Sequence, residues 1–197
     1  MIKKNKNFII TISGTPGSGK STIAQGLREK LKAKRIYVGG IRRKIAEEKN
    51  MTLAELNQYA MSHPETDVDV DKAASKEARQ LARNHPVIVE GRTQYHFLPE
   101  SIKIFVVVDI KIGAKRIWES IQNENQQQRN EAKVNNYKEL EQKVIERSKS
   151  DFKRFKKYYN IDYTDQKQYD FVIDTGHISA QEATQKVLDF IKNQLKT

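Results

Sequence analysis

The sequence predicts an α/β protein in which a five-stranded parallel sheet lies between two layers of helices. Two observations carry this expectation. Five short apolar runs, at residues 8–13, 35–38, 86–90, 103–109 and 171–175, alternate with segments whose apolar residues recur at helical spacing. Strands and helices that alternate in this way form parallel sheets covered on both faces. A glycine-rich loop also follows the first run directly, at the strand end where such sheets bind ligands.

That loop has the composition of a phosphate-binding loop. Residues 14–21 read GTPGSGKS and match the P-loop pattern G-x-x-x-x-G-K-[ST] without a mismatch. Its glycines permit positive φ angles, so that backbone N–H groups can surround a polyphosphate, and the helix after it adds a partial positive charge. We expect Lys20 to reach the β- and γ-phosphates of a nucleotide and Ser21 to hold Mg²⁺. The predicted nucleotide-binding residues are Gly14, Thr15, Pro16, Gly17, Ser18, Gly19, Lys20, Ser21 and Thr22.

The composition limits the class of protein. Its 197 residues suffice for one domain with a real core. The 36 Lys and Arg against 25 Asp and Glu give a formal charge of +11, which suits anionic partners such as nucleotides or nucleic acid. The absence of cysteine excludes disulfides, thiolate zinc sites and cysteine nucleophiles. The basic start runs straight into the first strand and no stretch is long enough for a membrane span, so we expect a cytoplasmic protein without a membrane partner.

Capping and turn residues predict the elements between the first and third strands. Gly39 and Gly40 are expected to close the second strand, with a helix over 41–49 behind them. A capping box, Thr52 with Glu55, opens a helix to about residue 61. Acids at positions 67, 69 and 71 are then expected in the first turn of a helix that runs to residue 83, where the helix dipole favours negative charge.

The second half of the chain is expected to be largely helical and polar from residue 111. Residues 123–136 are rich in Gln, Asn and Glu and offer few anchors for a core, which predicts a mobile segment there. A charged helix over 137–159 follows. Ser179 is expected to cap the last helix, whose buried stripe consists of Val187, Leu188 and Ile191.

Because the strands are parallel, their carboxyl ends meet at one edge of the sheet and form a single crevice. The phosphate loop and residues 39–43, 90–92 and 175–177 all follow strand ends and are expected there. Arginines occur in two of these segments, and Arg147 and Arg154 lie seven residues apart on one face of a later helix. Cations from several elements around a phosphate loop are what phosphoryl transfer between two nucleotides requires. The N-K-x-D motif of GTPases is absent from the sequence.

Several further stretches share one family's pattern. They are Gly39 with Arg43, residues 51–59, residues 64–67 with Asp71, and residues 89–92, 147–155, 158–162 and 169–175. Together with the phosphate loop they make nearly the whole chain similar to the small nucleoside monophosphate kinases, and within them to the archaeal-type cytidylate kinases. The segments 57–71 and 159–162 carry the resemblance most specifically, because the phosphate loop is shared across a superfamily.

The resemblance implies a reaction in which ATP and CMP, or dCMP, give ADP and CDP, with Mg²⁺ as the cofactor. It implies one kinase domain, residues 1–197, with a segment at about 39–84 that binds the nucleoside monophosphate (NMP) and a lid at about 115–155. Its implied NMP-binding residues are Gly39, Arg43, Asp67, Asp71 and Arg92, and Arg116 would lie against the ATP base. The implied catalytic residues are Lys20, Arg92, Arg147 and Arg154, of which the last two would close from the lid.

Two acids compete for the Mg²⁺ site. Glu90 and Asp109 each end an apolar strand, so the pattern alone leaves both open. The resemblance favours Glu90, beside Ser21, and Asp109 is then expected to be a helix N-cap.

Three positions depart from the family pattern. Gly40 stands where the family has Asp near the metal and the acceptor, and Ala74 stands where it usually has Gln in the region that touches the acceptor base. Both departures bear on base specificity. Ser120 replaces an arginine of the lid, which bears on the turnover rate.

Two other functions stay open on the sequence. One is another small P-loop kinase, for adenylate or uridylate. The other is a nucleotide-binding protein of low activity that binds RNA, suggested by the net charge and by the lysines and aromatic residues interleaved over 149–159. In either case we expect small nucleotides as ligands of a monomeric protein.

Overall fold

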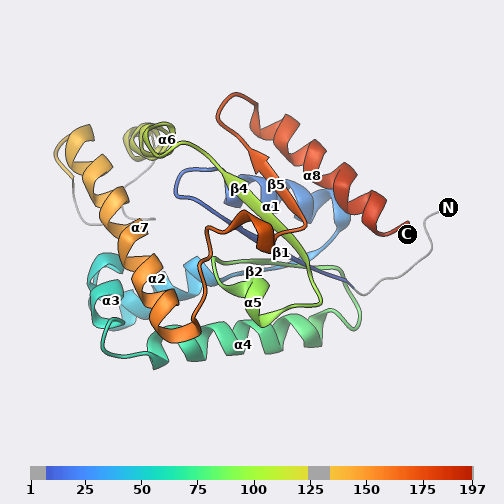
Figure 1. Cartoon of the computed structure of the whole chain (residues 1–197), viewed down its shortest axis with the longest axis horizontal. Helices are drawn as coiled ribbons and strands as arrows, with labels where there is room; N and C mark the ends of the chain where they lie inside the picture. The colour runs from blue at the N-terminus through green and yellow to red at the C-terminus, as the bar shows by residue number, and fades with distance from the viewer. Residues whose placement is uncertain (1–7, 124–133, 197) are drawn as a thin grey trace.

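The computed structural model of the chain describes residues 8–123 and 134–196. These residues form a five-stranded parallel sheet in the order β2-β3-β1-β4-β5, as predicted (Figure 1). The segment expected to be mobile lies for the most part outside the described residues. The strands are β1 (Ile9–Gly14), β2 (Lys34–Tyr37), β3 (Val87–Glu90), β4 (Ile102–Val107) and β5 (Phe171–Asp174).

Helices connect successive strands and cover both faces of the sheet. Figure 1 shows α8 above the sheet and α4 below it, with α7 across one end, which confirms the predicted layers. A short 3₁₀ helix over Gln166–Gln168 precedes β5. The α-helices are α1 (Lys20–Leu31), α2 (Val38–Glu48), α3 (Leu53–Tyr59), α4 (Glu65–Leu81), α5 (Gln94–Phe97), α6 (Ile110–Asn123), α7 (Tyr137–Tyr159) and α8 (Ala180–Gln194).

The two faces of the sheet pack on different helices because successive side chains of a strand point in opposite directions. Ile10 and Ile12 of β1 belong to a core with α1 and α8. Their neighbour Ile9 belongs to a second core, which includes Ala74 and Ala78 of α4. The sheet is therefore buried on both sides, and its carboxyl edge is left as the place where side chains of several elements can meet.

The ends of several helices agree with their predicted caps. Thr52 and Glu55 form the expected capping box at α3. The side chain of Ser179 accepts a hydrogen bond from the N–H of Glu182, 3.1 Å away, at the start of α8. The carboxylate of Asp109 accepts N–H bonds from Lys111 and Ile112, at 2.9 and 3.3 Å, so its predicted capping role at α6 is confirmed.

Two helix starts differ from the prediction. Helix α2 begins at Val38, so Gly39 and Gly40 lie within its first turn and do not close the strand before it. Helix α4 begins at Glu65, directly after Pro64, whose φ of −58° already suits a helix. Of the three acids expected in the first turn, only Asp67 lies there. Asp69 and Asp71 lie further along the helix, where the dipole effect expected for them is weaker.

Helix α7 joins the sheet to the helical segments at its edge. Its first half packs on α6 through Leu140 and Val144, and its second half contributes Phe155 to an aromatic core with Tyr163 and Tyr169. It also contacts α3. Within the described ranges, no helix combines the length and the apolar character that a membrane crossing demands.

Candidate active site

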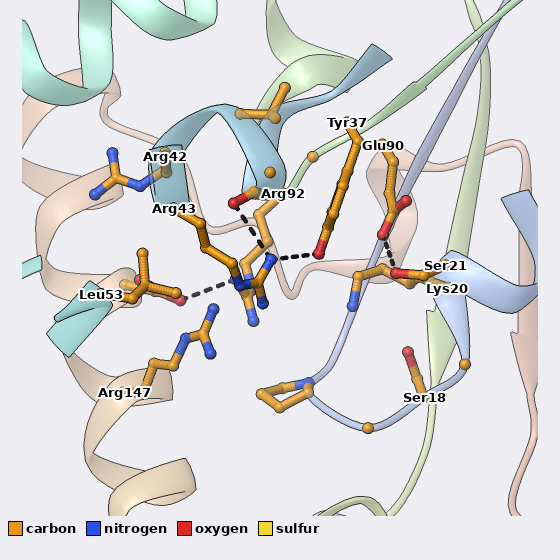
Figure 2. A pocket seen from close by; sticks show the side chains of 18 of the residues that line it. Ser18, Lys20, Ser21, Tyr37, Arg42, Arg43, Leu53, Glu90, Arg92 and Arg147 are labelled. Carbon is orange, nitrogen blue, oxygen red and sulfur yellow. Dashed lines mark hydrogen bonds and ion pairs between the residues drawn. The ribbon is translucent and has the colours of Figure 1, made fainter. Parts of the chain in front are cut away.

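A cavity of about 1200 Å³ opens at the carboxyl edge of the sheet. Each predicted segment contributes to its lining: residues 16–22 of the phosphate loop, residues 39, 40, 42 and 43, and residues 90–92. Of the predicted residues 175–177, the lining includes Thr175 and not the two that follow it. Helices α6 and α7 supply the opposite wall. Figure 2 shows Lys20, Ser21 and Glu90 on one side of this cavity and Arg43, Arg92 and Arg147 on the other.

The phosphate loop is tied to the neighbouring strand. The N–H of Thr15 donates to the carbonyl of Val106 at 3.1 Å, and the hydroxyl of Thr15 accepts the N–H of Val108 at 3.1 Å. Gly17 has a φ of 69°, which requires glycine, and it lies directly against the backbone of Gly113 in α6. These contacts tie the loop to β4 and α6, and only residues without a Cβ fit at the contact between Gly17 and Gly113.

Lys20 lies at the base of the cavity, where its Nζ donates to the carbonyl of Thr15 at 3.1 Å. Burial, together with the charges of Arg92 and Arg147, lowers the pKa of Lys20 to about 7, although Glu90 and Asp151 act in the opposite direction. An ammonium group in this position lacks sufficient negative charge around it. A bound phosphate would supply that charge, as the motif predicts.

The side chains of Ser21 and Glu90 fit a Mg²⁺ site. The hydroxyl of Ser21 donates to Oε1 of Glu90 at 2.6 Å, and Glu90 is only 3% exposed. Mg²⁺ prefers oxygen ligands and commonly combines one or two protein groups with phosphate oxygens and water. The described residues contain no cluster of three or more His, Asp or Glu side chains that would hold a metal without such help.

The other oxygen of Glu90 forms an ion pair with Arg35 of β2, a residue that the sequence analysis did not identify. Tyr37 and Glu90 are paired in the sheet, and Arg35 lies two residues before Tyr37 on the same face. The alternation of side chains along β2 could have indicated that Arg35 lies on the same face of the sheet as Tyr37. The pairing of the two strands was not available from the sequence.

Arg43 and Arg92 occupy the wall of the cavity opposite Lys20, the position predicted for them (Figure 2). Nη1 of Arg43 donates to the hydroxyl of Tyr37 at 2.5 Å and to the carbonyl of Gly39 at 3.3 Å. Nη1 of Arg92 lies 3.2 Å from Oδ2 of Asp151, and Arg147 lines the cavity one helical turn before Asp151. Three guanidinium groups from three different elements thus reach one region of the site.

Arg154 has a different setting from the other three arginines. It is 1% exposed, with Asp151 at 2.7 Å and Asp67 at 2.9 Å. Asp67 also pairs with Arg42 of α2, whose Nη2 donates to the side chain of Asn57 at 2.9 Å. These contacts join α7 to α2, α3 and α4. The lid function of Arg154 remains a prediction, and its contacts favour a role in holding these helices together.

Asp71 lines the cavity near this network and accepts three hydrogen bonds. Its donors are Thr93 at 2.8 Å, Gln94 at 2.9 Å and the hydroxyl of Tyr159 at 2.8 Å. Burial raises the pKa of Asp71 to about 6, against the effect of the donors. Asp67 and Asp71 are therefore placed where an acceptor could reach them, and their binding role stays a prediction.

Helix α6 contributes Arg116 and Ser120 to the cavity. Arg116 donates to the hydroxyl and the carbonyl of Thr175, at 3.1 and 2.6 Å, and Thr175 donates to the carbonyl of Ser18 at 2.9 Å. This links Arg116 to the phosphate loop. The hydroxyl of Ser120 is buried and has no hydrogen-bond partner in the described part of the chain.

Ala74 lies outside the region expected from the resemblance. It is 2% exposed and packs in the core between α4 and the sheet, and the cavity lining does not include it. The alanine itself therefore makes no contact with the cavity, and its bearing on base specificity stays a prediction.

The chain is similar in sequence to known proteins. Residues 10–142 match the model of a family described as an AAA domain. The chain is 37% identical over 169 residues to a cytidylate kinase of Methanothrix thermoacetophila, covering 86% of this chain and 89% of the relative. It is 36% identical over 187 residues to a cytidylate kinase of Methanosarcina barkeri, covering 93% of both.

Solved structures confirm the fold. TT1252 from Thermus thermophilus has a TM-score of 0.58 at 16% identity, covering 96% of this chain and 98% of that one. Shikimate kinase from Bacteroides thetaiotaomicron has a TM-score of 0.54 at 15% identity, covering 94% and 98%. At identities of 15% and 16%, the similarity establishes the fold alone. The two cytidylate kinases, in contrast, are identical to this chain at more than a third of the aligned residues, over most of its length. The chain therefore belongs to the cytidylate kinase family of P-loop nucleoside monophosphate kinases.

Proposed function

We propose that the protein transfers the γ-phosphoryl group of ATP to CMP or dCMP, giving ADP and CDP or dCDP. The observation that carries this proposal is the placement of Arg43, Arg92 and Arg147 across the cavity from Lys20. One nucleotide's phosphates on the loop and another's phosphate on the arginines would face each other. The names of the relatives support cytidine as the acceptor base.

The residues of this chain act by alignment and charge. The loop backbone and Lys20 hold the donor's β- and γ-phosphates, and Arg43 and Arg92 hold the acceptor's phosphate. The phosphoryl group in flight spreads negative charge over its oxygens, and cations fixed in advance stabilise that charge without reorganising. Arg147, one turn from Asp151, is placed to add a cation from the lid side.

Within the domain, one segment binds the acceptor and another forms the lid. Residues 39–84 form the NMP-binding segment, with Gly39, Asp67 and Asp71 at the acceptor, and residues 115–155 form the lid. Arg116, tied to Thr175 beside the loop, lies against the donor's base. Closure excludes water, which would otherwise hydrolyse ATP.

Ser21 and Glu90 would hold Mg²⁺ together with the donor's phosphates. When bound, the ion would neutralise charge on the β- and γ-phosphates. Ser21 and Glu90 are already hydrogen-bonded to each other, so their oxygens need little rearrangement to serve as ligands.

A single-turnover panel tests the proposal. Purified protein with ATP and Mg²⁺ is mixed with CMP, dCMP, UMP, AMP or GMP, and the diphosphate formed is measured by chromatography. CMP and dCMP should react fastest. A faster reaction with AMP or UMP would leave a nucleoside monophosphate kinase of different base preference, and no transfer to any acceptor would contradict the kinase assignment.

A second candidate is RNA binding by helix α7. Phe152 is 41% exposed, and Lys149, Lys153 and Lys156 lie on the same exposed face of the helix. Cations with an exposed aromatic ring suit single-stranded nucleic acid. A titration with single-stranded RNA at several salt concentrations tests this: affinity that falls steeply with salt and is lost in Phe152→Ala would support it.

A further inference from the structure

Tyr37 lies where β2 becomes α2, and its side chain lines the cavity. Its hydroxyl accepts a hydrogen bond from Nη1 of Arg43 at 2.5 Å. Tyr37 is also the partner of Glu90 across the sheet. Figure 2 shows the ring standing between Arg43 and Glu90, with its hydroxyl toward the arginines. The ring thus separates the acceptor side of the site from the Mg²⁺ side.

Two glycines leave room for this ring. Gly39 and Gly40 lie in the first turn of α2, and neither has a positive φ. Glycine destabilises such a turn relative to alanine, so the backbone gives no reason for either of them. A Cβ on Gly39 would lie 2.9 Å from Cε2 of Tyr37, and one on Gly40 would lie 2.8 Å from Cδ1. The glycines are explained by the ring that covers them.

Cations flank the ring. The guanidinium carbon of Arg43 is 5.7 Å from the ring centroid, and that of Arg35 is 5.1 Å from it. Arg35 is the ion-pair partner of Glu90, so it belongs to the Mg²⁺ side. Both contacts lie within the range of cation–π attraction, which holds the ring in place.

We propose that Tyr37 is a positioning residue for the acceptor's phosphate. Its hydroxyl fixes the guanidinium of Arg43, and its ring keeps that guanidinium apart from the carboxylate of Glu90, which would otherwise attract it. The hydroxyl oxygen accepts the hydrogen bond from Arg43, so the hydroxyl proton can be donated to a phosphate oxygen. This inference rests on the proposed function, in which Arg43 binds the acceptor's phosphate.

Tyr37→Phe tests the hydroxyl while it keeps the ring over the glycines. Loss of a hydrogen bond to a charged group is expected to raise the KM and the Kd for CMP about tenfold. The KM for ATP and the kcat should stay within about twofold, because the donor loop is untouched. Cytidine has no phosphate, so its affinity should not change. Tyr158→Phe is the matched control, since its hydroxyl donates to the carbonyl of Ala60 outside the cavity.

Gly40→Ala tests the ring while it keeps the hydroxyl. The new methyl group should displace Tyr37 and raise the KM for CMP by a similar factor. In the Tyr37→Phe background it should raise the KM by a smaller factor than in the wild type, because the hydrogen bond to Arg43 is already lost and only the contacts of the ring remain to be disturbed. Non-additivity of this kind identifies the Tyr37 ring as the cause.

Arg43→Gln distinguishes a failure of the role proposed for Tyr37 from a failure of the acceptor site itself. If Arg43→Gln raises the KM for CMP but Tyr37→Phe and Gly40→Ala do not, the positioning role of Tyr37 is wrong and the acceptor site stands. If Arg43→Gln itself leaves that KM unchanged, the acceptor site is wrong and the role of Tyr37 falls with it. A Tyr37→Phe protein in which ATP and CMP lose affinity equally would also overturn the inference.

Discussion

The phosphate loop and the acceptor side of the cavity face each other, yet they are built in different ways. The loop takes its binding groups from one continuous stretch, Gly14 to Thr22, and its only charged side chain is Lys20. The acceptor side combines side chains of α2, α4, α7 and the turn after β3. Its contact between Arg154 and Asp67, for example, spans 87 residues.

The two regions also differ in how their charges are balanced. Burial, together with the nearby charge of Arg92, lowers the pKa of Lys20 to about 7. Arg154 and Arg42 are matched by the buried carboxylates of Asp151 and Asp67. We infer that charge on the loop serves the ligand, whereas much of the charge on the acceptor side serves the fold. Substitutions on the two sides should therefore differ in their effects on activity and on stability.

The largest effect is expected for Lys20→Met. It removes the cation at the donor's phosphates, and kcat should fall by on the order of 10³-fold or more. Stability should be kept, because Met removes a desolvated charge. Steady-state turnover and thermal unfolding measure the two effects. Lys30→Met, at the exposed end of the same helix, is the control, and near-normal turnover of a folded Lys20→Met protein would contradict the assignment of the loop.

Arg154→Met should show the opposite behaviour, a large loss of stability. It leaves Asp151 and Asp67 buried with one partner fewer, which typically costs about 3–5 kcal/mol. Urea unfolding measures the change. Arg79→Met provides the comparison, because the pair of Arg79 with Glu100 is about half exposed and should contribute less than about 1 kcal/mol. Equal stabilities for the two variants would show that the buried network does not hold the helices together.

Arg92→Ala should affect both activity and stability, because Arg92 lines the cavity and also pairs with the buried carboxylate of Asp151. Loss of a charge-assisted contact to phosphate should raise the KM for CMP by roughly ten- to a hundredfold, about 1.5–3 kcal/mol. The KM for ATP should change far less. Thermal unfolding of the same variant reports the loss of the contact with Asp151. An equal or larger effect on ATP would move Arg92 to the donor side.

Ser120→Arg is expected to improve the enzyme. The buried hydroxyl of Ser120 lines the cavity on the face of α6 that also carries Arg116. A new cation there should act mainly on the transition state, so kcat should rise by about tenfold with little change in either KM. Gln122→Arg, on the exposed side of the helix, is the control. An unchanged or lower kcat would reject the idea that a lid cation is missing.

The smallest effect concerns protons. A lysine with a folded-state pKa of about 7 against an ordinary value of 10.5 is less protonated when folded, so its destabilising effect is complete below about pH 7 and is relieved as the pH rises toward 10.5. Bound phosphate should restore the ordinary pKa. At pH 8.5, binding of ADP should therefore take up nearly one proton, measured by calorimetry in buffers of different ionisation enthalpy. Lys20→Arg, which stays charged, should bind without uptake, and equal uptake by both proteins would assign the proton elsewhere.

Elements with local causes could be predicted from the sequence. The phosphate loop depends on closely spaced glycines and one lysine, and the caps at Thr52, Asp109 and Ser179 depend on residues three positions away or fewer. The alternation of apolar runs with helical periodicity predicted the parallel sheet, and parallel strands bring their carboxyl ends to one edge. The family resemblance then indicated which arginines to expect at that edge.

How those charges are paired became visible only in the folded structure. Arg147 and Arg154 are equivalent by helical spacing, yet α4 brings Asp67 against one of them alone. Arg35 meets Glu90 only because β2 and β3 are neighbours in the sheet. The need for glycine at position 40 is explained only by the ring of Tyr37 that packs against it. In both ion pairs the carboxylate that packs against the arginine comes from a distant part of the chain, so the pattern of neighbouring residues does not reveal it.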